Sequence, residues 1–257
     1  MKVIELKEYL DYHVGLYNQS DFIEKDPISI PHQFTLRQDR EIAGFFAAIF
    51  AWGKRTIILN KANELLERMD YDPYGFILNH QEKDLKALLG FKHRTFNDTD
   101  LLYFVYFLKQ HYTTHQSLEE AFLKGQQGEE YSVEQSLNAF KNYFFNLPEA
   151  PVRTRKHISS PLQKASCKRL NMFLRWMVRE DKYGVDFGLW KKIPTRKLIC
   201  PCDVHVLRVA EALNLVDRPK SDWKTAVKLT EALKIFDEED PAKYDFALFG
   251  LGVIGKL

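Results

Sequence analysis

The sequence contains few cysteines. Its 257 residues include three, Cys167, Cys200 and Cys202, which are too few for the disulfide framework of a small secreted protein. One residue separates Cys200 from Cys202, a spacing that zinc knuckles do not use. The four-cysteine pattern of iron–sulfur proteins is missing as well. We therefore expect a reduced protein with no metal site and no cofactor.

Long hydrophobic runs are also missing. The longest candidate, residues 42–52, contains Gly44 and is shorter than the roughly 20 residues that span a bilayer. Residues 1–8 are amphipathic and charged, unlike the apolar stretch of a secretory signal. These absences predict a protein that does not insert into membranes and is cytoplasmic, and nucleoid-associated if it is bacterial.

No segment alternates apolar and polar residues over the length of a strand, whereas apolar residues recur at three- and four-residue steps through most of the chain. With 45% hydrophobic and 14% aromatic residues, the chain can build a core. The sequence predicts an all-α monomer with two lobes, residues 1–150 and 151–257, packed as one compact unit. The predicted helices cover 39–52, 56–69, 99–110, 132–146, 168–179, 205–213, 223–235 and 241–251.

Basic residues concentrate in one segment, although the formal net charge is only +2. Residues 151–179 contain no Asp or Glu. Such a local excess of positive charge is typical of a surface that contacts a phosphate backbone. The basic residues of this segment are Arg153, Arg155, Lys156, Lys164, Lys168, Arg169, Arg175 and Arg179.

Lys168 opens one of the predicted helices and is followed by apolar residues. The nearby cations Lys164 and Arg169, and a helix N-terminus, would favour the neutral amine, which is the nucleophilic form of a lysine. A lysine on an amphipathic helix is more often a solvated charge, so both interpretations stay open.

Asp203 follows Pro201 and precedes the amphipathic segment that begins at Val204. Its residue type predicts a helix N-cap, whose carboxylate accepts backbone N–H groups. A carboxylate held in this way is rigid and ionised, and it can also stabilise a positively charged sugar. His205 and Trp176 are either neighbours of such a site or ordinary packing residues.

Two motifs resemble the helix-hairpin-helix DNA glycosylase superfamily. In its endonuclease III-like members the hairpin reads glycine-x-glycine-x-lysine-threonine-alanine-asparagine, which Lys168 and Asn171 match. A later valine-aspartate-threonine-histidine-x-x-arginine-valine is matched by Asp203, His205, Arg208 and Val209. Phe173-Leu174-Arg175 also resembles the lysine helix of archaeal 8-oxoguanine glycosylases.

The resemblance extends over residues 39–69 and 161–255. The segment Asp39–Trp52 followed by Gly53-Lys54-Arg55 looks like the first core helix of the superfamily and its loop. In place of the two hairpin glycines this sequence has Lys164 and Ser166. The chain is most similar to an uncharacterised bacterial branch of this superfamily. The segments that carry this similarity are Arg169–Trp176, Asp186–Trp190 and Asp240–Leu248.

This resemblance implies a two-lobed, helix-hairpin-helix glycosylase-like fold and DNA base-excision repair of a damaged base, with an oxidised purine as one candidate. Asp203 and Lys168 would then be the catalytic residues, Lys168 forming a Schiff base that permits β-elimination. The partner would be duplex DNA, bound through its phosphates and an extruded base. The residues implied to contact DNA are Lys164, Ser166, Arg169, Arg175, Lys54 and Arg55, and the site neighbours are His205, Trp176 and Asn171.

The alternative from a different functional class is a non-catalytic DNA-binding or damage-sensing module on the same fold. The missing hairpin glycines favour this alternative, because glycine lets a backbone approach phosphate closely. The distance between Lys168 and Asp203 separates the two hypotheses, since an enzyme of this kind needs both side chains at one place.

Overall fold

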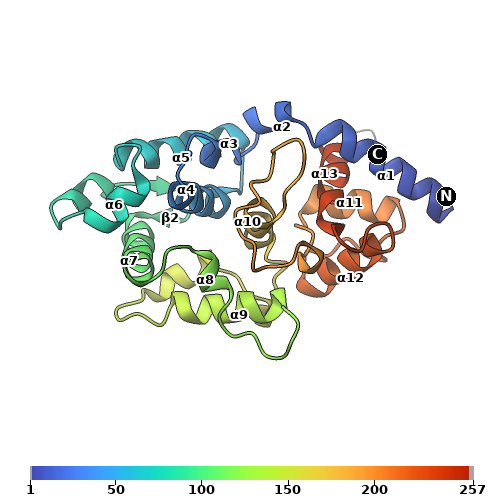
Figure 1. Cartoon of the computed structure of the whole chain (residues 1–257). Helices are drawn as coiled ribbons and strands as arrows, with labels where there is room; N and C mark the ends of the chain where they lie inside the picture. Colours follow the sequence, from blue (N-terminus) through green and yellow to red (C-terminus); the bar gives the residue numbers. More distant parts are fainter. Residues whose placement is uncertain (1, 255–257) are drawn as a thin grey trace. The chain divides into compact units, whose positions relative to one another are not determined.

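Regular structure in the computed structural model, which describes residues 2–254, is almost entirely helical (Figure 1). The strands within this range are β1 (Lys92–His93) and β2 (Phe96–Asn97), an antiparallel pair in which His93 faces Phe96. The prediction of an all-α protein is therefore confirmed. In the same range, no helix combines the length and the apolar character needed to cross a membrane.

The described chain divides into two compact units, and each unit combines separate stretches of sequence. The first unit comprises residues 2–24, 127–134 and 160–254, and the second comprises residues 25–126 and 135–159. This partition differs from the predicted boundary at residue 150. The start of the chain packs with its end, and residues 135–159 pack with the middle of the chain, which a boundary at one position cannot describe.

The second unit is built around aromatic side chains. Helix α4 (Arg37–Phe50) is buried along nearly its whole length. Phe104 of α7 (Asp98–Thr114) packs against Phe144 of α9 (Val133–Phe144) with ring centroids 4.7 Å apart, and the ring centroid of Phe45 on α4 lies 5.7 Å from that of Phe104. The other elements of this unit are α3 (Ser29–His32), α5 (Arg55–Arg68), α6 (Pro73–Asn79), η1 (Asp84–Leu88), α7 (Asp98–Thr114), α8 (Glu119–Phe122), most of α9 (Val133–Phe144) and η2 (Val152–His157).

The first unit has a separate apolar core, to which the helices from both ends of the described chain contribute (Figure 1). Helix α1 (Val3–Tyr17) packs against α13 (Tyr244–Ile254), and α13 packs against α11 (Val204–Ala212). Buried residues such as Leu10, Leu207 and Leu248 fill the space between these three helices. The elements of this unit are α1 (Val3–Tyr17), α2 (Ser20–Glu24), η3 (Pro161–Gln163), α10 (Lys168–Val178), η4 (Thr195–Lys197), α11 (Val204–Ala212), α12 (Trp223–Lys234), η5 (Pro241–Lys243) and α13 (Tyr244–Ile254).

Two glycines allow α13 to approach its neighbours closely. A Cβ atom at Gly250 would lie 2.2 Å from the ring of Tyr17 on α1, and a Cβ atom at Gly252 would lie 2.9 Å from the backbone oxygen of His205 on α11. The arginine Arg208 reinforces the second contact, because its Nη2 donates to the Gly252 carbonyl at 2.6 Å. A larger residue at Gly252 would therefore push α13 away from the first turn of α11.

We expect Gly252→Ala to lower the free energy of unfolding by about 1–3 kcal/mol, the usual cost of overpacking a close contact. Gly15→Ala is the matched control, because Gly15 is helical and a Cβ atom there would have no neighbour within 4 Å. That change should stabilise the protein by about 0.5–1 kcal/mol through helix propensity. Urea unfolding of both variants tests this, and equal stability of Gly252→Ala and the wild type would contradict the packing argument.

Candidate active site

Helix α10 begins at Lys168, and the loop before it follows an unusual backbone path. After the short turn η3, Lys164 adopts φ 58° and Cys167 adopts φ 52°. These are left-handed conformations, which glycine adopts at less cost than other residues. Lys164 is one of the two positions where the resemblance calls for glycine. The backbone there takes a conformation suited to glycine although the residue is lysine.

Three polar contacts hold this loop in place. The side-chain amide of Asn171 donates to the Ser166 carbonyl at 3.0 Å, and the Trp223 backbone N–H donates to the Lys164 carbonyl at 3.2 Å. The Ser166 hydroxyl lies 3.1 Å from that of Ser221. Ser166 is buried, with 8% of its surface exposed. Its hydroxyl therefore has a partner within the protein, and the expectation that Ser166 contacts DNA stays a prediction. Asn171, also buried, braces the loop.

Asp203 caps helix α11. Its Oδ1 accepts hydrogen bonds from the backbone N–H groups of His205 at 2.9 Å and Val206 at 3.0 Å. The predictions that a helix begins near Lys168 and that Asp203 caps a helix starting at Val204 are both confirmed. Because Oδ1 holds the helix, Oδ2 is the carboxylate oxygen that remains for other partners.

The other oxygen of Asp203 faces Lys168. The Oδ2 atom lies 3.9 Å from Lys168 Nζ, and the two side chains keep 23% and 25% of their surface exposed. Lys168 Nζ also lies 3.6 Å from the Met172 sulfur. A partly exposed ion pair of this kind contributes at most about 1 kcal/mol to stability. An amine and a rigid carboxylate that both face solvent can instead act together on a molecule from outside.

A third ionisable residue, Asp245 at the start of α13, was assigned no role from the sequence. It is 7% exposed, and its Oδ2 lies 2.6 Å from Arg175 Nη1. Burial raises the pKa of Asp245 to about 7, while Arg175 opposes this rise and the charge of Asp203 adds to it. The segment Asp240–Leu248 stood out in the sequence, yet nothing local indicates that Asp245 is buried against Arg175.

Arg175 and Arg179 lie inside the protein and pair with carboxylates. The side chain of each is 3% exposed. Arg175 contacts Asp245 and, at 3.4 Å, Asp186, whereas Arg179 contacts Asp186 at 3.1 Å and Asp240 at 2.8 Å. The expectation that Arg175 holds a DNA phosphate is therefore wrong for this structure, because its guanidinium group is buried and already neutralised.

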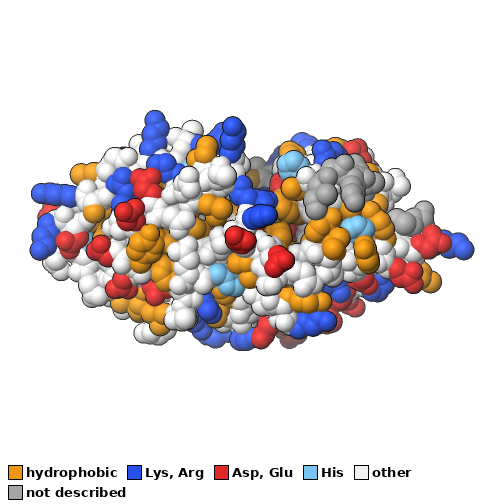
Figure 2. Space-filling model, turned by 90° about the horizontal axis from the view of Figure 1, so that it is seen from above, with side chains coloured by type: hydrophobic (Ala, Val, Ile, Leu, Met, Phe, Trp, Pro, Cys, Tyr) orange, Lys and Arg blue, Asp and Glu red, His pale blue; other side chains and the backbone are white. Residues whose placement is uncertain are grey.

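Residues 151–179 contain no Asp or Glu, yet they do not form a surface without acidic groups. Arg153 also has a carboxylate partner, Asp100, which is remote in sequence and fully buried. Lys164 is exposed, whereas Arg169 is half-buried, and burial lowers the pKa of Arg169 to about 10. On the face drawn in Figure 2, Lys and Arg side chains lie in separate groups among acidic ones. Charges of both signs therefore share the protein surface.

The remaining predicted residues are dispersed. His205 is exposed on the first turn of α11, and Trp176 is completely buried, so it forms part of the core. Lys54 and Arg55 belong to the second unit, where Lys54 is the exposed residue before α5 and Arg55 is half-buried at its start. Lys54 and Arg55 are thus placed at a helix start, in a unit different from that of Lys168.

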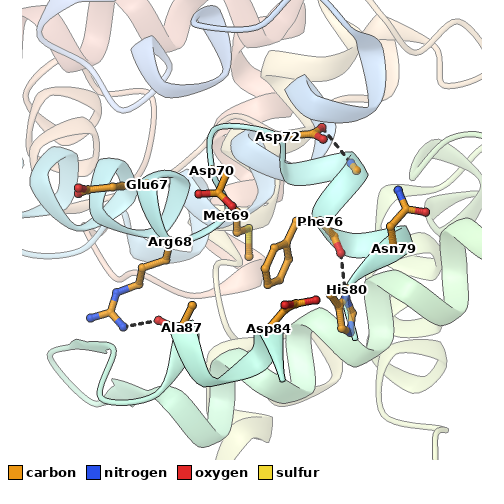
Figure 3. Close-up of a pocket in the computed structure, with 11 residues that line it drawn as sticks. Glu67, Arg68, Met69, Asp70, Asp72, Phe76, Asn79, His80, Asp84 and Ala87 are labelled. Carbon is orange, nitrogen blue, oxygen red and sulfur yellow. Dashed lines mark hydrogen bonds between the residues drawn. The ribbon is translucent and has the colours of Figure 1, made fainter. Parts of the chain in front are cut away.

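A separate cavity of about 520 Å³ lies in the second unit between α5, α6 and η1 (Figure 3). Phe76 and Met69 point into it, and the carboxylates of Asp70 and Asp84 lie at its wall (Figure 3). Such an acidic wall does not suit a phosphate group. The full lining is Glu67, Arg68, Met69, Asp70, Asp72, Gly75, Phe76, Asn79, His80, Asp84 and Ala87, which includes no residue predicted from the sequence.

A comparison with protein families gives one match. The model of a family described as "Protein of unknown function (DUF2400)" matches residues 26–254. No curated protein and no solved structure matches the chain. The match covers most of the sequence, including both Lys168 and Asp203, but its description carries no activity.

Arg175→Met should lower the free energy of unfolding by about 3–5 kcal/mol, because it leaves Asp245 and Asp186 buried without their cation. Lys164→Met removes an exposed cation from the same region and should change stability by no more than about 0.5 kcal/mol. Chemical denaturation of the two variants measures the difference. If Arg175→Met unfolded at the same denaturant concentration as the wild type, the guanidinium group of Arg175 would not be needed for stability.

Proposed function

We propose, for a chain that belongs to the DUF2400 family, that the protein is a DNA base-excision repair glycosylase with β-elimination lyase activity and a helix-hairpin-helix glycosylase-like fold. The observation that carries the proposal is the 3.9 Å distance between Lys168 Nζ and Asp203 Oδ2, each at the start of a helix and open to solvent. An amine and a rigid carboxylate placed together can attack a sugar carbon and stabilise the positive charge that develops on it.

The proposed reaction begins with the neutral amine of Lys168. Its lone pair attacks C1′ of the damaged nucleotide, the bond from C1′ to the base breaks, and the base leaves with a proton. Asp203 stabilises the positive charge that develops on the sugar. One of the two amine protons goes to the departing base and the other goes to O4′ as the sugar ring opens, which leaves an imine between Lys168 and C1′.

Strand cleavage follows from the imine. Loss of a proton from C2′ expels the 3′ phosphate in a β-elimination, and water then releases Lys168. None of these steps requires a metal or a redox cofactor. The base must leave the duplex before the attack, which costs a few kcal/mol and costs least for a damaged or mismatched base. The resemblance to archaeal 8-oxoguanine glycosylases favours an oxidised purine as the substrate. The proposal itself covers any damaged base.

DNA would be held by cations near Lys168, of which Lys164 is exposed and Arg169 is half-buried. Lys164 lies at the surface of the loop before α10, and Arg169 is the second residue of α10. Lys54 and Arg55 remain proposed phosphate contacts of the second unit. We propose that the protein works as a cytoplasmic monomer on duplex DNA.

A second function, a non-catalytic DNA-binding module, is favoured by one observation. The loop before α10 has neither hairpin glycine, and the Lys164 carbonyl and the Ser166 hydroxyl both have partners within the protein. In that case the 3.9 Å pair would only fix the start of α10 on α11. Covalent trapping separates the two functions, because a binding module forms no imine.

Lys168→Gln should abolish the complex that borohydride traps between the protein and a duplex carrying an abasic site, because only an amine forms an imine. Asp203→Asn should slow base release from a lesion-bearing duplex by orders of magnitude, since asparagine can still cap α11 but carries no charge. Lys224→Gln is the matched control, an exposed lysine on α12. Equal trapping by Lys168→Gln and the control would refute the lyase, and unfolding of Asp203→Asn would assign Asp203 a structural role.

Binding to undamaged duplex DNA should weaken as salt rises. Lys164→Ala should lower the slope of log affinity against log salt by about one, as expected for the loss of one phosphate contact. Arg175→Lys retains a buried cation and should leave the slope unchanged. Fluorescence anisotropy at several salt concentrations measures both slopes, and an affinity that does not depend on salt would exclude a phosphate-backbone partner.

A further inference from the structure

The short hairpin of β1 and β2 carries an exposed arginine at its turn. Arg94 follows β1 and adopts φ 56°. Its guanidinium carbon lies 4.4 Å from the centre of the Trp52 ring, in the turn between α4 and α5. The electrons of a tryptophan ring attract a cation placed over its face. This contact gives the charge of Arg94 a defined position on the surface of the second unit.

A buried histidine fixes the hairpin on this turn. His93 is 2% exposed, and its Nε2 lies 3.0 Å from the Phe50 carbonyl oxygen at the end of α4. Its ring also meets that of Trp52 edge-on, with centroids 5.9 Å apart. Burial lowers the pKa of His93, the contact with Phe50 opposes this, and the charges of Arg94 and Lys61 add to it. His93 is therefore a neutral anchor for the hairpin.

The turn leaves room for the guanidinium group of Arg94. Gly53 has φ 111°, a conformation that residues with a side chain rarely adopt. A Cβ atom at Gly53 would lie 2.7 Å from Arg94 Nη1. The guanidinium group thus lies against the backbone that leads through Lys54 into α5. Glycine at this position allows both the turn and the close approach of Arg94.

The guanidinium group of Arg94 forms no ion pair or hydrogen bond with residues 2–254. Arg68 of the same unit provides a contrast. It lies 5.8 Å from the Phe91 ring, but its guanidinium group binds Glu64 and the Ala87 carbonyl (Figure 3). A guanidinium group has five N–H donors in a fork that matches an oxyanion. In Arg94 these donors are available to an acceptor from outside the chain.

Other cations belong to the same turn and hairpin. Lys54 and Lys92 are exposed, and neither forms an ion pair within the described part of the chain. Arg153 donates to the carbonyl of the residue after Arg94 at 3.1 Å, although Asp100 balances its charge. Several cations with few carboxylates attract a multiply charged oxyanion. This arrangement favours a phosphate group over a carboxylate.

We propose that Arg94, held on the Trp52 ring, is a phosphate-binding residue of the second unit, and that the phosphate belongs to the backbone of duplex DNA. The choice of DNA rests on the proposed function, whereas the phosphate chemistry rests on the hairpin itself. Two N–H groups of Arg94 would bind two phosphate oxygens. Because Trp52 already restricts the side chain, less conformational freedom is lost on binding. Such a contact carries no base information, so damaged and undamaged DNA would bind alike.

The first test measures binding of a fluorescent, undamaged duplex by anisotropy over a range of salt concentrations. Arg94→Ala should weaken binding on the order of tenfold near about 0.1 M salt and lower the slope of log affinity against log salt by about one. Lys86→Ala, which removes an exposed cation of η1 in the same unit, is the matched control. Equal binding by Arg94→Ala and the wild type would overturn the proposal, and so would an equal loss in both variants.

The role of Trp52 is tested by a double-mutant cycle. Trp52→Leu removes the ring under the guanidinium group and should weaken binding by part of the loss in Arg94→Ala, whereas Trp52→Phe retains an aromatic face and should restore it. In an Arg94→Ala background, Trp52→Leu should have no further effect. If Trp52→Leu weakened binding equally with and without Arg94, Trp52 would act independently and its positioning role would be refuted.

Chemical modification identifies the source of the phosphate. Phenylglyoxal modifies accessible guanidinium groups, and mass spectrometry locates the products. Duplex DNA should protect Arg94, whereas inorganic phosphate at the same total phosphate concentration should not. Arg68 is the internal control, because Glu64 holds its guanidinium group with or without DNA. Equal protection by both would support a site for free phosphate and overturn the DNA partner, and protection by neither would overturn the site.

These measurements are independent of the proposed lyase, because none of them uses damaged DNA. DNA binding that depends on Arg94, without any borohydride trapping, would refute the lyase and support the phosphate site. Trapping by a protein whose DNA affinity does not depend on Arg94 would support the lyase and refute the phosphate site.

Discussion

The geometry of the candidate site depends on the buried guanidinium group of Arg175. This group joins α10 to α13 through Asp245 and to the following segment through Asp186, and it lies 4.2 Å from the ring of Phe246. Because α10 begins with Lys168, the same contacts fix the direction from which the amine approaches Asp203. A buried ion pair adds little net stability compared with apolar packing. Its directional bonds do restrict how two helices lie against each other, and we take this as its role here.

Local features of the sequence predicted the parts of the site that local interactions produce. The apolar periodicity after Lys168 and the proline before Asp203 indicated two helix starts, and both occur at these residues. These features depend on residues within one or two helical turns of each other. The pattern of the local sequence is therefore enough to predict them.

The sequence did not reveal interactions between residues far apart in the chain. Arg175 and Arg179 belong to a segment without acidic residues, which suggested an exposed basic surface. Their partners Asp245 and Asp240 follow more than 60 residues later, and only tertiary packing brings them close. Lys164 illustrates a related limit. Lysine at this position gave no sign of a left-handed backbone, because the constraint comes from the contacts of the loop with Trp223 and Ser221.

The close packing of α1 on α13 also has a consequence for the order in which the protein folds during synthesis. Residues 25–126 and 135–159 form the second unit, so the whole sequence of this unit is synthesised before α10. Domains tend to fold as units while the chain emerges. Helix α1 is made before the second unit but packs on α13, which is made after it. The apolar face of α1 must therefore wait for more than 200 residues of synthesis before α13 covers it, while the second unit is already able to fold.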